Sequence, residues 1–518
     1  MHNKETAVEH GLKGGTHEHR EMFKMLKRSG IIKHNMNIAG QKGAVLLRER
    51  KTQNSGSTVI CDCCCGVFKR RWFGTHRRRC GTEQCVQPRA IASTIYFSSM
   101  PVSKDFKKDI LSKFSGDEIG ELCQKNESIA MIGSKIYMKV RARVDKKLEV
   151  RRSVMADMRR LAHMFCCFRT IANSKCSSRF SENVDVSVLE MFKRENFDIL
   201  ELAFANYTEM KDGEHCTEKS GLALAVYYLL VKAAKIVKVF VFHLKGNDDA
   251  RAAQTGDFLD VLHSCKHELI GGAIYNTNKK RQTKLRRVES LPLLSEVQKL
   301  KTYICSSMSA LIEGNYLHWT SKEFVDLHDL ACARLTLFNA RREGEPARLH
   351  LTDWVDGCNG VWLDKQRIEK MSAEEREIFE ESFVMYQTGK GMNHLVPVQV
   401  PQDTMPALQK VTDTATRIQC GISEANVYLF SSTLASEANV SGWHALNRVC
   451  QKAGVESHKI TATKMRHLAS TTFEGLELPE EKRKAFYSHM GHSRAINESI
   501  YQAPLAEREI LEVGAVLR

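Results

Sequence analysis

The sequence has no apolar run long enough to cross a lipid bilayer. Its longest run, Gly221 to Val231, covers 11 residues and is then interrupted by Lys232, Lys235 and Lys238. A membrane-spanning helix needs about 20 predominantly apolar residues. The first thirty residues also lack the apolar core of a secretory signal. We therefore expect a soluble protein with no membrane partner, in which residues 221–231 form part of a buried helix.

The lack of an export signal also argues against a disulfide framework. The chain has 17 cysteines, of which six fall between Cys61 and Cys85 while the others are scattered. Disulfides persist in oxidising compartments, whereas a local cysteine cluster in a reducing compartment is typical of a metal site. The pattern therefore predicts a single local metal site.

Acidic residues are too few to balance the basic ones. There are 77 Lys and Arg against 61 Asp and Glu, which gives a formal net charge of +16 over 518 residues. Such a balance fits a polyanionic partner, although many basic proteins use excess charge for solubility alone. The length is sufficient for two or three domains with substantial cores. The choice of a nucleic acid as partner therefore depends on the motifs.

One cluster of cysteine and histidine has the spacing of a zinc finger. The arrangement Cys61-x2-Cys64-x11-His76-x3-Cys80 supplies four ligands, and Phe68 stands where a finger places a core residue. Zinc in structural sites takes four thiolate or imidazole ligands in a tetrahedron. We predict a structural Zn²⁺ held by these four residues, with Cys63 and Cys65 as competitors for the first pair. Five nearby arginines suit either phosphate contacts or a solvated surface: Arg70, Arg71, Arg77, Arg78 and Arg79.

The apolar pattern becomes helical from Arg151 onward. We expect Ser153 to cap a helix there. The basic run Lys279 to Arg287 follows this helical region, and an interdomain linker, a solvated loop and a nuclear import signal explain it equally well. We predict five regions: a basic, flexible segment (1–56), the CCHC finger (57–90), a connecting region (91–150), a helical domain with the basic run (151–287), and a C-terminal domain (288–518).

Local signals within the C-terminal domain predict a hairpin and two helices. Phe383 to Tyr386 and Leu395 to Val400 flank a Thr-Gly-Lys-Gly turn, which is typical of a β-hairpin. Pro479, two glutamates and Gly491 mark a helix over 479–490. A final helix is expected over Leu505 to Leu517.

Five residues in four local frames suit one chemistry. Arg342 lies in NARREGEPARLHLTDW and Lys390 in QTGKGMNHLVPV, while Arg466 lies in TKMRH and His492 and Tyr501 in HMGHSRAINESIY. Taken singly, each is more often a surface, capping or core residue. Together, two guanidinium forks, a proton donor, an imidazole and a hydroxyl can bind a phosphodiester and transfer it to tyrosine. Such strand transfer needs neither ATP nor a metal, because the tyrosine ester conserves the bond energy.

These frames resemble those of the tyrosine recombinases. Arg342 is followed by Glu345, Leu349 and Asp353 at the family's intervals, which selects Arg342 over Arg341. Gly389 to Pro397 is similar to the hairpin that carries the catalytic lysine. Twenty-six residues separate Arg466 from His492, and Tyr501 follows nine residues after His492. The form of the second arginine box is most similar to crypton-like recombinases of eukaryotic mobile elements and the host proteins derived from them.

The resemblance implies a fold and a function. It implies a mainly helical α+β protein in which a helical core-binding domain and a recombinase catalytic domain follow the finger. The implied reaction is site-specific DNA recombination or integration through a 3′-phosphotyrosine, with Arg342, Lys390, Arg466, His492 and Tyr501 as catalytic residues. The implied partners are double-stranded DNA and further copies of the chain, as a homodimer to homotetramer on DNA in the nucleus. Only the finger would need a metal.

Two positions depart from the family pattern. Thr463 stands where the family usually has His or Lys. Residues 356–381 are interpreted as an insertion, because 48 residues separate Arg342 from Lys390. Two other functions stay open: a host DNA-binding regulator that no longer cleaves, and a type IB topoisomerase. Retention of all five residues favours the recombinase over the regulator, and the Gly-His frame and the finger argue against the topoisomerase.

Overall fold

The computed structural model divides the chain into two compact units, residues 1–277 and 278–518. It describes residues 16–38, 58–61, 67–77, 80, 90–92, 100–143, 147–175, 186–212, 215–314, 318–389, 395–433, 436–476 and 478–518. Over these residues the fold is mainly helical with small antiparallel sheets, which confirms the α+β prediction. None of the described helices is both long and apolar enough to span a membrane.

The first unit begins with a helix and a small ββα element. Helix α2 (His17–Ile38) lies inside segment 1–56, for which the sequence predicts flexibility, so that prediction has to be corrected for residues 17–38. Strand β1 (Thr58–Cys61) pairs with β2 (Val67–Lys69) and with β3 (Ala90–Ala92), and α3 (Arg70–Arg77) follows β2 directly. Val59, Cys61 and Phe73 form the small core of this element.

A single hydrophobic core joins the helices between residues 100 and 277. The longest helix, α7 (Lys147–Lys175), buries Val154, Met158 and Leu161 as the periodicity predicts. It begins before Ser153, which therefore lies inside the helix and does not cap it. Phe106 and Ile132 of the predicted connecting region belong to the same core, so residues 100–143 are part of the helical unit and not a connection.

The apolar run at 221–231 is buried as expected, within α9 (Ser220–Ile236). The remaining elements of this unit are α4 (Lys104–Asp109), η2 (Leu111–Lys113), α5 (Glu118–Lys125), α6 (Glu127–Met138), η4 (Val188–Phe192), η5 (Arg194–Asn196), α8 (Phe197–Thr208), β4 (Glu209–Asp212), β5 (His215–Glu218), η6 (Val237–Gly246), α10 (Asp249–Ser264) and α11 (Lys266–Lys280), which crosses the unit boundary.

Most of the basic run at 279–287 is helical. Residues 279–285 belong to the end of α11 and to the wide-turn helix η7 (Arg281–Leu285), and Arg286 and Arg287 form a bend after it. The boundary between the two units falls inside α11, about ten residues before the predicted start of the C-terminal domain.

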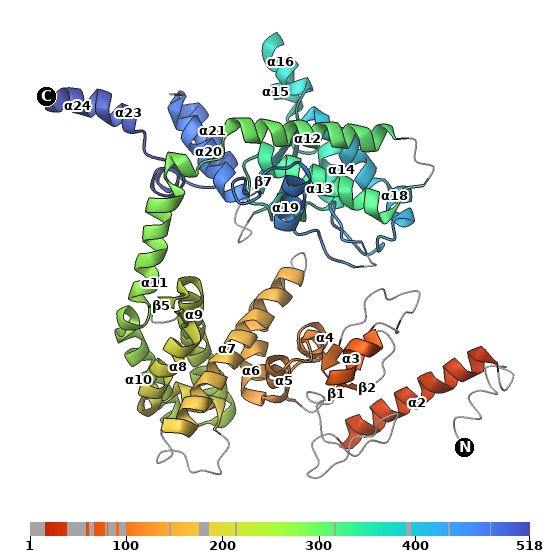
Figure 1. Cartoon of the computed structure of the whole chain (residues 1–518), viewed down its shortest axis with the longest axis vertical. Helices are drawn as coiled ribbons and strands as arrows, with labels where there is room; N and C mark the ends of the chain where they lie inside the picture. Colours follow the sequence, from red (N-terminus) through yellow and green to blue (C-terminus); the bar gives the residue numbers. More distant parts are fainter. Residues whose placement is uncertain are drawn as a thin grey trace. The chain divides into compact units, whose positions relative to one another are not determined.

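The second unit packs around α13 (Ser321–Phe338), a helix that starts with a capping box between Thr320 and Glu323. Helices α12 (Leu294–Glu313) and α19 (Gly442–Lys452) pack against α13, and α12 runs along one side of the unit (Figure 1). Phe324, Leu327 and their neighbours fill the core between them.

The predicted hairpin is present in this unit. Strands β6 (Phe383–Thr388) and β7 (Leu395–Val400) pair in antiparallel register, with Phe383 opposite Val400 and Thr388 opposite Leu395. Before the hairpin, the segment interpreted as an insertion forms α15 (Lys365–Glu369) and α16 (Ala373–Glu380), which project from the unit in Figure 1.

The C-terminal region follows the predicted order. Helix α21 (Glu480–Met490) ends at Gly491, and a helical tail covers the predicted 505–517 segment. The other elements of the unit are η8 (Val288–Ser290), η9 (Pro346–Arg348), α14 (Leu351–Cys358), η11 (Gln402–Thr404), α17 (Met405–Thr412), α18 (Thr414–Gln419), α20 (Ala462–Gly475), α22 (Arg494–Ile496), η12 (Asn497–Tyr501), α23 (Ala506–Arg508), η13 (Glu509–Val513) and α24 (Gly514–Leu517).

Candidate active site and metal centre

The first predicted arginine lies in a strained turn after α13. Ala340 takes a left-handed conformation with φ of 47°, which costs a residue with a Cβ about 1–2 kcal/mol. The next two residues share one carboxylate, because Glu345 accepts hydrogen bonds from Arg341 Nε at 2.7 Å and from Arg342 Nη1 at 3.1 Å. The Arg341 side chain is 1% exposed and the Arg342 side chain 44%. The turn therefore buries Arg341 and leaves Arg342 accessible.

Arg466 lies at the buried centre of the same region. Helix α20 carries it, and its side chain is 1% exposed. Its Nη1 donates to the Ala340 carbonyl at 3.4 Å and its Nη2 to the Met490 carbonyl at 2.8 Å. Among the described residues, no acceptor pairs with its Nε. A buried donor without a partner is unfavourable, and a bound anion would offer it an acceptor.

His492 is placed by the end of α21. Gly491 has φ of 66° and ends the helix in the left-handed conformation that glycine tolerates. The His492 ring then lies between two partners, with Nδ1 3.1 Å from Arg466 Nη2 and Nε2 3.0 Å from Asn497 Oδ1. A guanidinium group can only donate. Nδ1 therefore accepts a hydrogen bond from Arg466, and Nε2 carries the proton and donates a hydrogen bond to Asn497 Oδ1.

This environment keeps the His492 ring neutral. Burial lowers the pKa of His492 to about 4, and the positive charges of Arg466 and Arg342 act in the same direction, while the hydrogen bond with Asn497 opposes them. The imidazole is therefore uncharged near neutral pH in the protein without bound DNA.

Tyr501 is the last residue of the π-helix η12, a wide helical turn that is often found at functional sites. Its ring stacks on that of His492, with centroids 4.9 Å apart and 16° between the planes. The guanidinium carbon of Arg466 lies 4.9 Å from the centroid of the same ring. Arg342 and Arg466 both lie close enough to the Tyr501 side chain that it acts to raise the pKa of each guanidinium group. Four of the five predicted catalytic residues thus come together: Arg342, Arg466, His492 and Tyr501. We call these four residues the Tyr501 cluster.

The electrostatic balance of the cluster is positive. The guanidinium groups of Arg341 and Arg342 share one carboxylate, that of Glu345, and Arg466 has no acidic partner among the ion pairs of the described residues. Burial lowers the pKa of Arg466, whereas interaction with Tyr501 acts in the opposite direction. Burial also acts to lower the pKa of Arg342, but Glu345 and Tyr501 outweigh it and the pKa is raised. Such a cluster is suited to an anion.

Tyr487, the nearest alternative nucleophile, has a structural role. Its side chain is buried, and its hydroxyl donates a hydrogen bond to Glu474 Oε1. Burial, together with that carboxylate, raises the pKa of Tyr487 to about 12. The sequence interval that selected Tyr501 over Tyr487 agrees with this geometry.

Two predicted positions lie away from the cluster or outside the described residues. Lys390 falls in the hairpin turn, residues 390–394, which the structure does not describe. Thr463 is exposed at the start of α20 and lines a neighbouring cavity.

Two further residues, His467 and Arg286, bind the backbone around Tyr501, and the sequence alone predicts no catalytic role for either. His467 Nδ1 lies 2.6 Å from the Tyr501 carbonyl oxygen. Arg286, from the basic run, donates from Nε to the Gln502 carbonyl and from Nη2 to the Glu498 carbonyl, both at 2.8 Å. His467 directly follows Arg466 in the TKMRH frame, and this position could have indicated that it lies near the site. Arg286 had no local signal beyond its charge.

The candidate metal centre lies in the ββα element of the first unit. The ligand atoms of Cys61, His76 and Cys80 all lie within 4.8 Å of one another, and the two sulfur atoms are 3.9 Å apart. Phe68 stacks on the His76 ring with centroids 3.7 Å apart, which orients the imidazole. These three residues could bind a metal. Cys64, the predicted fourth ligand, lies outside the described residues, as do Cys63 and Cys65.

Comparisons of the chain with protein-family models, with curated proteins and with solved structures found no match.

Proposed function

We propose that this protein is a tyrosine recombinase that cleaves and rejoins double-stranded DNA. The observation that carries the proposal is the arrangement of Arg342, Arg466 and His492 around the side chain of Tyr501. A tyrosine held by two guanidinium groups and an imidazole suits attack on a phosphodiester, because the negative charge of the transition state develops beside fixed cations.

Each residue has a step in the proposed reaction. The Tyr501 hydroxyl gives its proton to His492 and its oxygen forms a bond to the scissile phosphorus, while the bond to the 5′ oxygen breaks. Arg342 and Arg466 stabilise the non-bridging oxygens. Lys390 on the hairpin turn gives a proton to the departing 5′ oxygen. Rejoining reverses these steps with a 5′ hydroxyl of another strand, so no external energy source is consumed.

The geometry without DNA supports a resting state in which Tyr501 covers Arg466. The ring lies over the guanidinium group, and both nitrogens of His492 are already hydrogen-bonded. A phosphate that bound Arg466 would have to displace the ring. A cation–π contact contributes only about 0.5–2 kcal/mol, so charge-assisted bonds to a phosphate can replace it. In this state His492 orients Arg466. The imidazole can take a proton from Tyr501 only after one of its two hydrogen bonds, to Arg466 or to Asn497, has broken.

The metal centre supports the DNA-binding part of the proposal. Two thiolates on a tetrahedral zinc ion with Zn–S bonds of about 2.3 Å lie about 3.8 Å apart, close to the 3.9 Å between Cys61 and Cys80. Zn²⁺ with Cys64 as fourth ligand is therefore our assignment. The ββα order and the net charge of +16 suit contact with DNA in the nucleus, and strand exchange requires a homodimer or homotetramer on the DNA.

The test is to trap the covalent intermediate. A nicked duplex that carries the gene's flanking sequence loses its short 5′-hydroxyl fragment after cleavage, so the protein should stay attached through denaturation. Tyr501→Phe should abolish the adduct, and Arg342→Ala or Arg466→Ala should reduce its rate of formation by about 100-fold or more. Tyr487→Phe is the control and should still form it. An adduct of equal yield with Tyr501→Phe would refute the proposal.

A DNA-binding regulator without catalysis is the second candidate. The Cys61, His76 and Cys80 group and the basic charge favour it, since both serve recognition alone. Under this alternative the wild-type protein binds duplexes but never forms the adduct.

A further inference from the structure

A cavity of about 470 Å³ is lined in part by residues that neighbour Arg342 and Arg466 in the sequence. Its walls come from the turn that carries Arg342, from α19, and from the start of α20, which carries Arg466. Glu343 directly follows Arg342, and Thr463 precedes Arg466 by three residues. A phosphate bound between the two arginines would therefore have its adjacent nucleotide within reach of this cavity.

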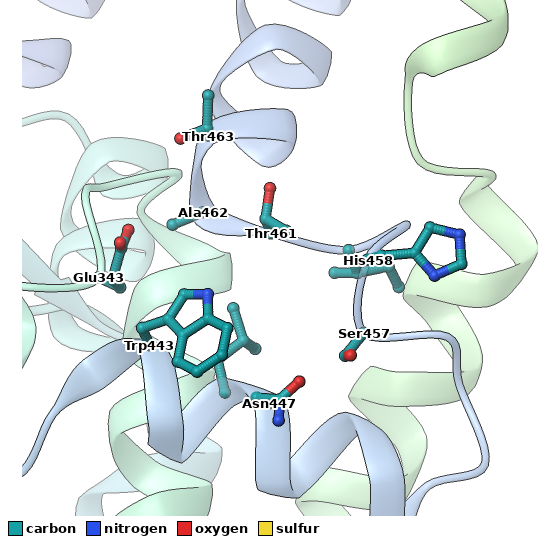
Figure 2. A pocket seen from close by; sticks show the side chains of 10 residues that line it. Glu343, Trp443, Asn447, Ser457, His458, Thr461, Ala462 and Thr463 are labelled. Carbon is teal, nitrogen blue, oxygen red and sulfur yellow. The ribbon is translucent and has the colours of Figure 1, made fainter. Parts of the chain in front are cut away.

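The lining of the cavity is suited to a flat, partly polar ligand. Figure 2 shows the Trp443 indole at the centre of the cavity, with the Asn447 amide below it and the Thr461 hydroxyl above it. Trp443 is 52% exposed, although it is one of only 5 tryptophans in the chain. Exposed aromatic faces in single-strand binding sites stack on nucleobases.

The charge of the lining distinguishes a base from a phosphate. Glu343 lies on the wall opposite His458 in Figure 2, and a carboxylate there repels an anion. It can accept a hydrogen bond from the N–H group that each of the four bases presents on its pairing edge. The volume lies in the range of natural small-ligand sites, roughly 300–1,000 Å³.

Close packing ties the cavity to the Tyr501 cluster. A Cβ atom on Gly442, the first residue of α19, would overlap the carbonyl oxygen of Glu343. The helix that carries Trp443 thus packs directly on the turn that carries Arg342. The position of a ligand in the cavity and the position of the arginine are therefore fixed relative to each other.

We propose that this cavity binds an unpaired nucleobase next to the scissile phosphate, stacked on Trp443 and hydrogen-bonded by Glu343 and Asn447. The inference rests on the proposed function, because it assumes a phosphodiester at Tyr501. It adds a requirement that the cleavage chemistry does not have: the DNA opens locally, so that one base leaves the helical stack.

The test compares two short duplexes of the same sequence with the full-length protein. One duplex is fully paired, and the other contains one base opposite an abasic site at the position next to the cleavage point. The wild-type protein should bind the second duplex about 5- to 100-fold more tightly, the range that base–aromatic stacking supports. Trp443→Ala should bring this ratio close to one without weakening binding to the paired duplex, and Trp443→Phe should retain most of it.

Trp362→Ala is the matched control, because Trp362 is also a half-exposed tryptophan that lines a different cavity. It should leave the ratio unchanged, and melting curves of all variants should show that each is folded. An equal affinity of the wild-type protein for the two duplexes would overturn the inference, and so would a ratio that survives both Trp443→Ala and Asn447→Ala. The Tyr501 adduct is measured separately, so loss of the ratio with an intact adduct refutes only this inference.

Discussion

At the scale of single residues, the site combines buried charge with neutral histidine. Arg341 and Arg466 are fixed in the interior, whereas Arg342 stays accessible and reaches Tyr501. The left-handed Ala340 links them, since its carbonyl accepts from Arg466 and its turn sets the direction of the next two side chains. Strain of this kind is expected where surrounding contacts hold a functional residue in place.

His492 makes the folded protein sensitive to acid. Its pKa is lowered from 6.5 to about 4 on folding, chiefly by burial. Below pH 6.5 the imidazole of His492 is protonated in the unfolded chain but stays neutral in the folded chain. The contribution of neutral His492 to the free energy of unfolding is therefore fully present above pH 6.5 and is lost progressively as the pH falls to about 4. His492→Asn should therefore lose less thermal stability than the wild type between pH 7 and pH 4.5. Parallel curves of Tm against pH for the two proteins would contradict this.

Thr463 is predicted to have a small effect on cleavage. It is exposed at the start of α20, and a hydroxyl offers a neutral hydrogen bond, which is worth roughly half of a charge-assisted one. Thr463→Ala should lower the single-turnover cleavage rate only modestly, and Thr463→His should raise it. A loss as large as that of Arg466→Ala would assign Thr463 a catalytic role.

At the scale of elements, η12 is held from two sides. Helix α20 holds the Tyr501 carbonyl through His467, and Arg286 binds the carbonyls of Glu498 and Gln502. These backbone contacts fix where the phenol lies without touching it. The basic run therefore has a positioning role within the second unit in addition to its charge.

We predict that Arg286→Ala slows cleavage about 10- to 100-fold at saturating DNA, because small misplacement of a reacting group has costs of this size. Arg287→Ala is the matched control, since the Arg287 side chain is 63% exposed and its one ion pair with a described residue is with Glu289. Both variants lose one positive charge, so equal losses of cleavage rate would show that charge, and not positioning, is what matters.

The sequence predicted the local helices and turns more accurately than the contacts between segments that are far apart in the sequence. The Pro479, Gly491 and Thr-Gly-Lys-Gly signals gave α21 and the hairpin because caps and turns are encoded within a few residues. The intervals around Arg342, Arg466, His492 and Tyr501 predicted residues that the fold does bring together. Ser153 was misassigned because the helix propensity of the preceding residues extends α7 beyond its apolar stripe. The Arg286 contact, across more than 200 residues, has no local signature.

At the scale of the whole molecule, the described residues form two large cores in addition to the small core of the ββα element. One extends from Met100 to Ala273 and the other from Leu300 to Met465, and no residue belongs to both. The metal centre lies in the first unit and the Tyr501 cluster in the second. Recognition and chemistry are therefore expected to be separable by mutation.

If the proposed function holds, disruption of the candidate metal centre should weaken DNA binding and spare the chemistry. Arginine side chains supply the charge stabilisation that a catalytic metal would otherwise give. Cys61→Ser with Cys80→Ser should raise the Kd for duplex DNA while the cleavage rate at saturating protein stays near that of the wild type. Cys358→Ser, an exposed cysteine of the second unit, serves as control. Loss of cleavage at saturation in the double variant would contradict this separation.

The most direct measurement identifies the residue joined to DNA. The trapped adduct is digested with nuclease and trypsin, and the peptides are analysed by mass spectrometry. Residues 495–508 form one tryptic peptide whose single tyrosine is Tyr501, while Tyr487 falls in the peptide 485–494. We predict a nucleotide on the 495–508 peptide, attached through a 3′ phosphate. A nucleotide on the 485–494 peptide, or a 5′ linkage, would contradict it.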